Sequence, residues 1–328
     1  MFKRKLILIF TLAVILVCGQ IYTIRAPLSE NSAEQVLMEK NGIDFETAAD
    51  NNKYNSLNSK NTGWGFKKDK GAAPYIDNKT KDMFNKYNTF YIGNESEKVL
   101  YLTFDEGYEN GYTGIILDCL KEKQVPAAFF ITMPYLKNET DLVDRMVNEG
   151  HVVGNHSVNH PNLAKISLAQ VNSELKGLDD LFYEKYGMHM NFLRPPEGEF
   201  SEKLLAYVSD MGYKTVLWSF AYRDWDIKNQ KGAEYAFNQV TPYLHDGAIL
   251  LLHAVSSDNA AALPKIIDFA REQGYEFKSI SELTNKKPET GVSGFSLLNI
   301  ICKVDRKLHK LCSPDLLYPY RMRSMQMV

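Results

Sequence analysis

This sequence of 328 residues contains few cysteines and has a formal net charge close to zero. Four cysteines occur and none forms a CxxC pair, which excludes a disulfide framework as the basis of the fold. Cys302 and Cys312 could bridge locally in an oxidising compartment, and the sequence leaves that open. The formal net charge of −2 gives no global sign of nucleic-acid binding, and a basic footprint is absent over most of the length, so no nucleic-acid partner is expected.

One long apolar run is present, at the N-terminus. Three basic residues at positions 3–5 precede an apolar stretch over residues 6–18, an arrangement typical of an export signal. Residues 1–25 are therefore predicted to be a signal peptide, cleaved near Gly19, or a membrane anchor, because residues 6–24 are just long enough to cross a bilayer of about 30 Å. We expect an exported protein, anchored or secreted, whose membrane contact is confined to this segment.

The rest of the chain divides by composition into three parts. Residues 26–95 are polar and rich in Asn and Lys, and we expect them to form a loosely ordered arm or linker. Within the arm, Trp64 and Phe66 either pack on the main domain, which we favour, or form the rim of a sugar-binding groove. Residues 96–285 carry the pattern of a folded domain. Residues 286–328 form a basic tail that contacts an anionic wall polymer or membrane, or is simply solvated.

Short apolar runs alternate with longer helical stretches throughout the folded domain. This alternation is typical of parallel strands covered by crossover helices. About seven such units predict an α/β fold, a distorted (β/α) barrel that is closed or nearly closed, with an open doubly wound sheet as the alternative. In both architectures the functional residues gather beyond the C-terminal ends of the strands. The expected strands are 99–104, 125–132, 151–154, 191–193, 214–219, 247–252 and 275–280, and the expected helices are 113–123, 141–149, 168–186, 202–211, 232–244 and 260–273.

Polar residues suited to metal chemistry follow two of these strands. Asp105 and Glu106 are adjacent at a strand end and point different ways, so one can ligate a metal ion while the other acts as a base. His156 and His160 are four residues apart, and Pro161 favours a loop there, from which both imidazoles can converge on one ion. With Glu106 or Asp105 they make a set that leaves positions open for water and substrate.

Two further strand ends carry an arginine and a histidine. Arg194 begins the segment RPPEG, whose prolines stiffen the backbone, and we expect its guanidinium to orient Asp105. His253 ends an apolar strand. A nearby carboxylate, with Asp224 as the candidate, would raise the pKa of His253 and make it a general acid.

Taken together, these segments resemble the polysaccharide deacetylase family, the carbohydrate esterases that share the NodB homology domain. The resemblance covers roughly residues 95–283 and implies a distorted (β/α) barrel with a divalent ion, most often zinc, while other divalent ions remain open. The segments that carry it are TFDEG at 103–107, HSVNH at 156–160, RPPEG at 194–198, DW at 224–225 and ILLLH at 249–253.

The resemblance implies a role for each matching residue. It makes Asp105 the base, Arg194 its support and His253 the general acid, and it places an oxyanion-binding backbone N–H near Glu197. The catalytic positions are matched by Asp105, Arg194, Asp224 and His253. The metal-ligand positions are matched by Glu106, His156 and His160. The substrate-binding candidates are Tyr108, Pro195, Pro196, Glu197, Gly198 and Trp225.

Two positions depart from the family pattern. Glu106 stands where the family has Asp, which lengthens the ligand arm and alters the metal geometry. Glu197 adds a negative charge at the rim of the site. Both departures bear on metal affinity and rate, and neither bears on the fold.

Further segments are similar to one branch of the family, the muramic δ-lactam-forming de-N-acetylases of endospore-forming bacteria. The similarity implies that the substrate is N-acetylmuramic acid in peptidoglycan strands from which an amidase has removed the stem peptides. It also implies a muramic δ-lactam product in the spore cortex and action in the space around the forespore. The segments concerned are TFDEGYENGY at 103–112, WGFKK at 64–68, DW at 224–225 and NQKG at 229–232.

Two alternative functions stay open. The same chemistry on N-acetylglucosamine, in peptidoglycan or chitin-like oligomers, needs the same site residues. A non-catalytic glycan-binding protein with a decayed site is suggested by Glu106 in place of Asp. Against that second alternative, Asp105 and both histidines are present together, and a binding protein would not need them.

Overall fold

The computed structural model describes residues 51–284. The predicted export segment, residues 26–50 of the arm, the basic tail and the Cys302–Cys312 pair lie outside the described residues. Among residues 51–284, no helix is both long and apolar enough to span a membrane.

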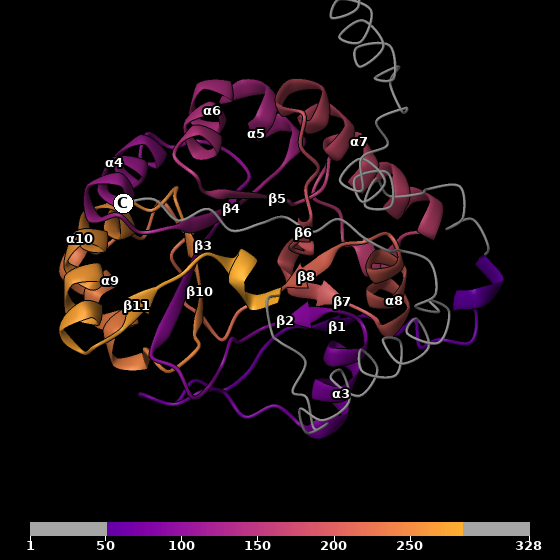
Figure 1. Ribbon diagram of the computed structural model, residues 1–328, viewed down its shortest axis with the longest axis horizontal. Coiled ribbons are helices and arrows are strands. Elements are labelled where there is room, and N and C mark those ends of the chain that lie inside the picture. Colours follow the sequence, from indigo (N-terminus) through magenta and orange to yellow (C-terminus); the bar gives the residue numbers. More distant parts are fainter. Residues whose placement is uncertain (1–50, 285–328) are drawn as a thin grey trace, which may run out of the picture. The chain divides into compact units, whose positions relative to one another are not determined.

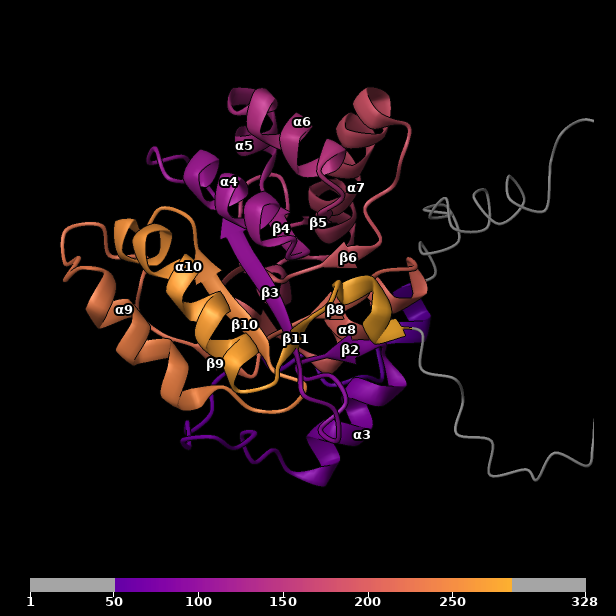
Figure 2. The same cartoon turned by 60° about the vertical axis from the view of Figure 1, so that its left-hand side comes forward.

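A curved sheet of nine parallel strands forms the centre of the described part of the chain (Figures 1 and 2). The strand order is β2-β8-β6-β5-β4-β3-β10-β9, and β11 pairs with the start of β3. The strands are β2 (Thr89–Phe90), β3 (Val99–Glu106), β4 (Ala127–Ile131), β5 (Val152–Asn155), β6 (Phe192–Leu193), β8 (Lys214–Val216), β9 (Phe220–Ala221), β10 (Ile249–His253) and β11 (Glu276–Phe277).

One chain segment, residues 214–221, contributes strands near both ends of this row, β8 next to the terminal β2 and β9 at the opposite end. Its first part, β8, pairs with β6, and its second part, β9, pairs with β10. Between them, the Ser219 N–H donates to the Ile249 carbonyl at 3.0 Å. The row therefore curves round on itself, and the predicted distorted (β/α) barrel is confirmed in place of an open doubly wound sheet.

Helices surround the barrel and bury the outer faces of its strands (Figure 2). The longest of them, α7, begins with a capping box between Ser167 and Gln170 and ends at Gly187 in a left-handed conformation, which explains its sharp limits. The helices are α3 (Asn78–Lys86), α4 (Thr113–Lys123), α5 (Met133–Asn138), α6 (Thr140–Asn148), α7 (Leu168–Tyr186), α8 (Glu202–Asp210), α9 (Ala233–Val240) and α10 (Ser257–Glu272). Short 3₁₀ turns are η2 (Asn51–Tyr54), η3 (Leu163–Lys165), η4 (Pro196–Gly198), η5 (Thr241–Tyr243) and η6 (Ile280–Thr284).

The expectation of a loose arm is wrong for residues 51–95. This stretch contains α3, contributes β2 to the main sheet, and forms a second small sheet in which β1 (Thr62–Gly63) pairs with β7 (Glu199–Phe200). The polar composition suggested a loose arm, but a few aromatic side chains bury enough apolar area to hold this segment against the rest of the fold.

Trp64 is the centre of these aromatic contacts. Its ring lies 5.5 Å from that of Phe66, 5.3 Å from Phe84 and from Tyr91, and 6.5 Å from Phe200. The favoured interpretation, that Trp64 and Phe66 pack on the main domain, is confirmed.

Candidate active site

The ends of neighbouring parallel strands bring the predicted site residues together. Asp105 lies near the end of β3, directly opposite His253 at the end of β10. His156 follows β5, and Arg194 follows β6, the strand that pairs with β5. This is the edge at which barrels place their functional groups.

A pocket of about 910 Å³ opens at this edge of the barrel. Most of the predicted residues lie on its wall, whereas Arg194 and Asp224 are buried directly behind it and Pro195, Pro196 and Glu106 do not line it. The predicted residues that line the pocket are Asp105, Tyr108, His156, His160, Glu197, Gly198, Trp225 and His253. Lining residues that the sequence did not single out include Thr132, Pro134, Asn159, Trp218, Ala221 and Tyr222.

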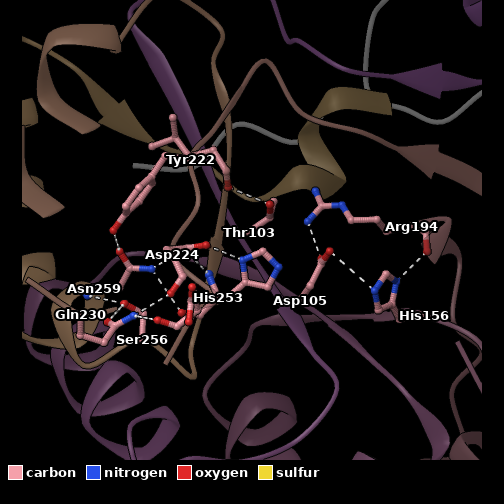
Figure 3. A network of polar contacts seen from close by, with 12 residues as sticks. Thr103, Asp105, His156, Arg194, Tyr222, Asp224, Gln230, His253, Ser256 and Asn259 are labelled. Carbon is pink, nitrogen blue, oxygen red and sulfur yellow. Dashed lines mark hydrogen bonds and ion pairs between the residues drawn. The ribbon is translucent and has the colours of Figure 1, made fainter. Parts of the chain in front are cut away.

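Arg194 holds Asp105 in place, as predicted (Figure 3). The guanidinium is fully buried and donates to Asp105 Oδ1 at 2.8 Å. Its other nitrogens donate to the carbonyls of Val216 at 3.0 Å and Leu217 at 3.3 Å, and its plane lies over the Phe130 ring at 4.2 Å. These contacts leave Oδ2 of Asp105 free of the guanidinium, 3.6 Å from His156 Nε2.

The environment keeps Asp105 ionised at neutral pH. Burial alone would raise the pKa of this carboxyl. The charge of Arg194 is the largest opposing cause, followed by His156, His253 and the Arg194 hydrogen bond. Together they outweigh burial, so the pKa of Asp105 lies below its ordinary value. An ionised carboxylate in a pocket can accept a proton from a water molecule.

Asp224 is the partner of His253, also as predicted. It accepts hydrogen bonds from the His253 ring Nδ1 at 2.7 Å and from the His253 backbone N–H at 2.8 Å (Figure 3). Burial lowers the pKa of His253, but the Asp224 carboxylate outweighs it, and the pKa lies above its ordinary value. Because Nδ1 is bonded to Asp224, a protonated ring offers its Nε2–H for donation.

A polar network behind Asp224 was not predicted from the sequence. Asn259 Nδ2 donates to Asp224 Oδ2 at 2.6 Å, and the Tyr222 hydroxyl donates to Asn259 Oδ1. Gln230 donates from Nε2 to the Asp224 carbonyl at 3.0 Å, and its Oε1 accepts from the Ser256 hydroxyl at 2.6 Å. The sequence signal for this network was the polar run at residues 256–259, shortly after His253. This run begins at Ser256, the N-cap of α10.

His156 and His160 are arranged as a pair of metal ligands would be. The His156 Nδ1 lies 2.7 Å from the Arg194 carbonyl and must donate to it, which leaves the lone pair on Nε2. Burial lowers the pKa of His156 to about 4, so the ring is neutral. The two Nε2 atoms are 3.2 Å apart. Two imidazole nitrogens on one tetrahedral zinc ion are separated by about 3.3 Å, so the pair fits a divalent ion.

Glu106 does not join this pair in the structure. Adjacent side chains on a strand point to opposite faces, and with Asp105 in the pocket Glu106 is directed away from it. Its side chain is fully buried, and neither carboxylate oxygen has a hydrogen-bond partner among the described residues. Burial, then the neighbouring Glu109 carboxylate, raise its pKa well above the ordinary value. Within residues 51–284, no three His, Cys, Asp or Glu side chains form a complete metal set, so Glu106 as third ligand stays a prediction.

The rim of the pocket carries aromatic side chains and a strained turn. Tyr108 and Trp225 line the pocket and are each about half exposed, which suits them to stack on sugar rings. Glu197 adopts a left-handed conformation with φ of 59°, an unusual state for a residue other than glycine. The rigid Pro195 and Pro196 precede it, so they shape the wall without lining it.

Known proteins match this chain in sequence and structure. The family described as polysaccharide deacetylase matches residues 92–216. The peptidoglycan-N-acetylmuramic acid deacetylase PdaA of Bacillus subtilis is 46% identical over 226 residues, which cover 68% of this chain and 86% of that protein. A peptidoglycan-N-acetylglucosamine deacetylase of Bacillus cereus is 34% identical over 207 residues, covering 61% of this chain and 94% of that protein.

A solved structure agrees with the sequence comparisons. The structure of Bacillus subtilis PdaA, described as a family 4 carbohydrate esterase, matches with a TM-score of 0.67 at 44% identity and covers 69% of this chain and 97% of that one. The match over most of the length of that protein shows that the two chains share a fold. The chain therefore belongs to the polysaccharide deacetylase family, the family 4 carbohydrate esterases, and is a hydrolase of that family.

Proposed function

We propose that this protein removes the N-acetyl group from N-acetylmuramic acid in peptidoglycan. The observation that carries the proposal is a base and an acid facing one pocket, each held by its own buried partner: Asp105 by Arg194 and His253 by Asp224. The choice of sugar is supported by the higher identity to the N-acetylmuramic acid deacetylase, 46%, than to the N-acetylglucosamine deacetylase, 34%.

The residues divide the hydrolysis between them. Asp105 accepts a proton from the water that attacks the acetyl carbonyl. The backbone N–H near Glu197 donates to the oxygen as negative charge develops on it. His253, protonated through its pairing with Asp224, donates its Nε2 proton to the leaving amine nitrogen. Acetate and the free amino sugar are the products.

We propose that the reaction uses a divalent ion, with zinc as the first candidate. Family 4 deacetylases depend on a metal in general. His156 and His160 would hold the ion. Glu106 is the third ligand expected from the motif, and its carboxylate, which is directed away from the pocket in the structure, would have to turn toward the pair. Such an ion supplies Lewis-acid polarisation of the carbonyl and a more acidic water.

The setting of the reaction follows the proposed substrate. Peptidoglycan lies outside the cytoplasm, which agrees with the export segment predicted for residues 1–25. We propose that the strands are first stripped of stem peptides by an amidase and that the freed amine then closes onto the lactyl carboxyl as a muramic δ-lactam in the spore cortex. The support is the branch-level similarity of residues 103–112 and 64–68.

Mass spectrometry of peptide-free glycan strands tests the choice of substrate. The strands are incubated with residues 26–328, with and without added zinc. We expect a zinc-dependent loss of acetyl from muramic acid, with a further loss of water if the lactam also forms. Loss from glucosamine instead would move the assignment to the N-acetylglucosamine deacetylases. No loss from either sugar, in folded protein that still binds the strands, would favour the decayed-site alternative.

A further inference from the structure

Trp64 joins two segments of the pocket wall that are far apart in sequence. Its backbone N–H donates to the Gly198 carbonyl at 2.9 Å. Its indole Nε1–H donates to the Trp218 carbonyl at 2.8 Å. Gly198 and Trp218 both line the pocket, one from the turn after β6 and the other from the segment between β8 and β9, whereas Trp64 does not line it. One residue outside the pocket, through its backbone N–H and its indole N–H, thus fixes how two of the pocket walls meet.

Lys68 makes a third contact of the same kind. Its ammonium donates to the carbonyl of Ala221, another lining residue, at 3.0 Å. The ammonium also lies over the rings of Phe220 and Tyr243, at 5.0 and 4.9 Å, where burial lowers its pKa. We call residues 62–68 the brace, because they hold the pocket wall at three carbonyls.

The wall that the brace holds is strained. Glu197 and Gly198 are consecutive left-handed residues, with φ of 59° and 66°. A Cβ at position 198 would lie 2.6 Å from the Trp218 ring and 3.2 Å from the Trp64 Cβ, so only glycine allows this close approach. A non-glycine residue stays left-handed only where its surroundings hold it. The pairing of β1 with β7 supplies the remaining support directly after the turn.

We propose that Trp64 is a positioning residue for the deacetylation, acting through the Glu197–Gly198 turn. The Gly198 N–H already donates to the Pro195 carbonyl at 3.0 Å, so the donor that the turn can offer is the Glu197 N–H. The brace keeps the turn where this N–H can meet the charge that develops on the acetyl oxygen, and misplacing such a donor weakens only the transition state. The inference rests on the proposed function. Trp64 lies outside residues 92–216, so the match to the family description assigns it no role.

Trp64→Phe in the full chain is the test, because it keeps the aromatic packing and removes the indole donor. We expect kcat to fall by about 10- to 100-fold, with KM within about twofold of the parent value. Lys68→Met, which removes the contact to Ala221, is the second variant and should lower kcat in the same direction. Hydrogen exchange of the backbone amides of residues 197–200 should quicken in both variants, with exchange over 153–160 unchanged.

Phe66→Leu is the matched control. Phe66 packs on the Trp64 ring at 5.5 Å but makes none of the three hydrogen bonds, so its loss should lower the melting temperature and leave kcat within about twofold of the parent. An unchanged kcat in Trp64→Phe, or an equal loss in Phe66→Leu, would overturn the proposal. If the parent protein releases no acetate, the proposed function fails. The hydrogen exchange then tests the brace alone, and equal exchange in Trp64→Phe and Phe66→Leu overturns it.

Discussion

Replacing Asp105 by Asn should lower the kcat for acetate release by about 10²- to 10⁴-fold, the contribution of a positioned general base. The amide has the shape of the carboxylate and its oxygen can still accept from Arg194, so the pocket keeps its form. It cannot take a proton from water at neutral pH. Initial rates of acetate release from peptide-free strands, with melting temperatures for both proteins, measure the effect.

Asp118→Asn is the control for this variant. Asp118 also pairs with an arginine, Arg145, at 2.7 Å, but it lies on the surface with its side chain 74% exposed. Losing that ion pair should leave the rate of acetate release unchanged, because an exposed ion pair contributes little to the free energy of unfolding. A rate of acetate release in Asp105→Asn equal to that of the parent would show that the base has been assigned to the wrong residue.

Replacing Asp224 by Asn should move the alkaline limb of the pH–rate profile to lower pH and reduce the maximal rate by about 10²-fold or more. The general acid must be protonated, so activity falls as the pH rises through the pKa of His253. The Asp224 carboxylate holds that pKa above its ordinary value. Without the negative charge, burial dominates and the pKa drops, so protonated His253 is lost at a lower pH.

A second buried Asp–His pair in the same chain provides the control. Asp179 accepts from His189 Nδ1 at 2.7 Å and is buried, but neither residue lines the pocket. Asp179→Asn should lower the free energy of unfolding and leave the alkaline limb of the pH–rate profile at the same pH as in the parent protein. A limb that stays unmoved in Asp224→Asn, at wild-type stability, would mean that another group supplies the proton to the amine.

The sequence predicted the barrel and most of its site because local signals agree with the fold. The helix over 168–186 has the predicted limits, since a capping box and a glycine mark them. The site residues were found because parallel strands bring their C-terminal ends to one edge, so Asp105, His156, Arg194 and His253 could be grouped without knowing the structure.

What the sequence missed depends on contacts distant along the chain. Side chains alternate between the two faces of a strand, so the sequence predicts that Asp105 and Glu106 face opposite ways. The pairing of β3 with β10 and β4 determines which of the two faces the pocket. Asn259 looked like part of a loop, because only the packing of α10 places its amide against Asp224. Residues 51–95 looked loose, because the partners of their aromatic side chains lie far along the sequence: Tyr207, which packs on Tyr54, is 153 residues further on.

The isotopic content of acetate released from peptide-free peptidoglycan strands in ¹⁸O-labelled water tests whether this protein hydrolyses an N-acetyl group with a metal ion. Hydrolysis of an amide places one oxygen from water in the acid, so we expect singly labelled acetate, lost with a chelator and restored by zinc. Folded, zinc-loaded protein that binds the strands and releases no labelled acetate would contradict it.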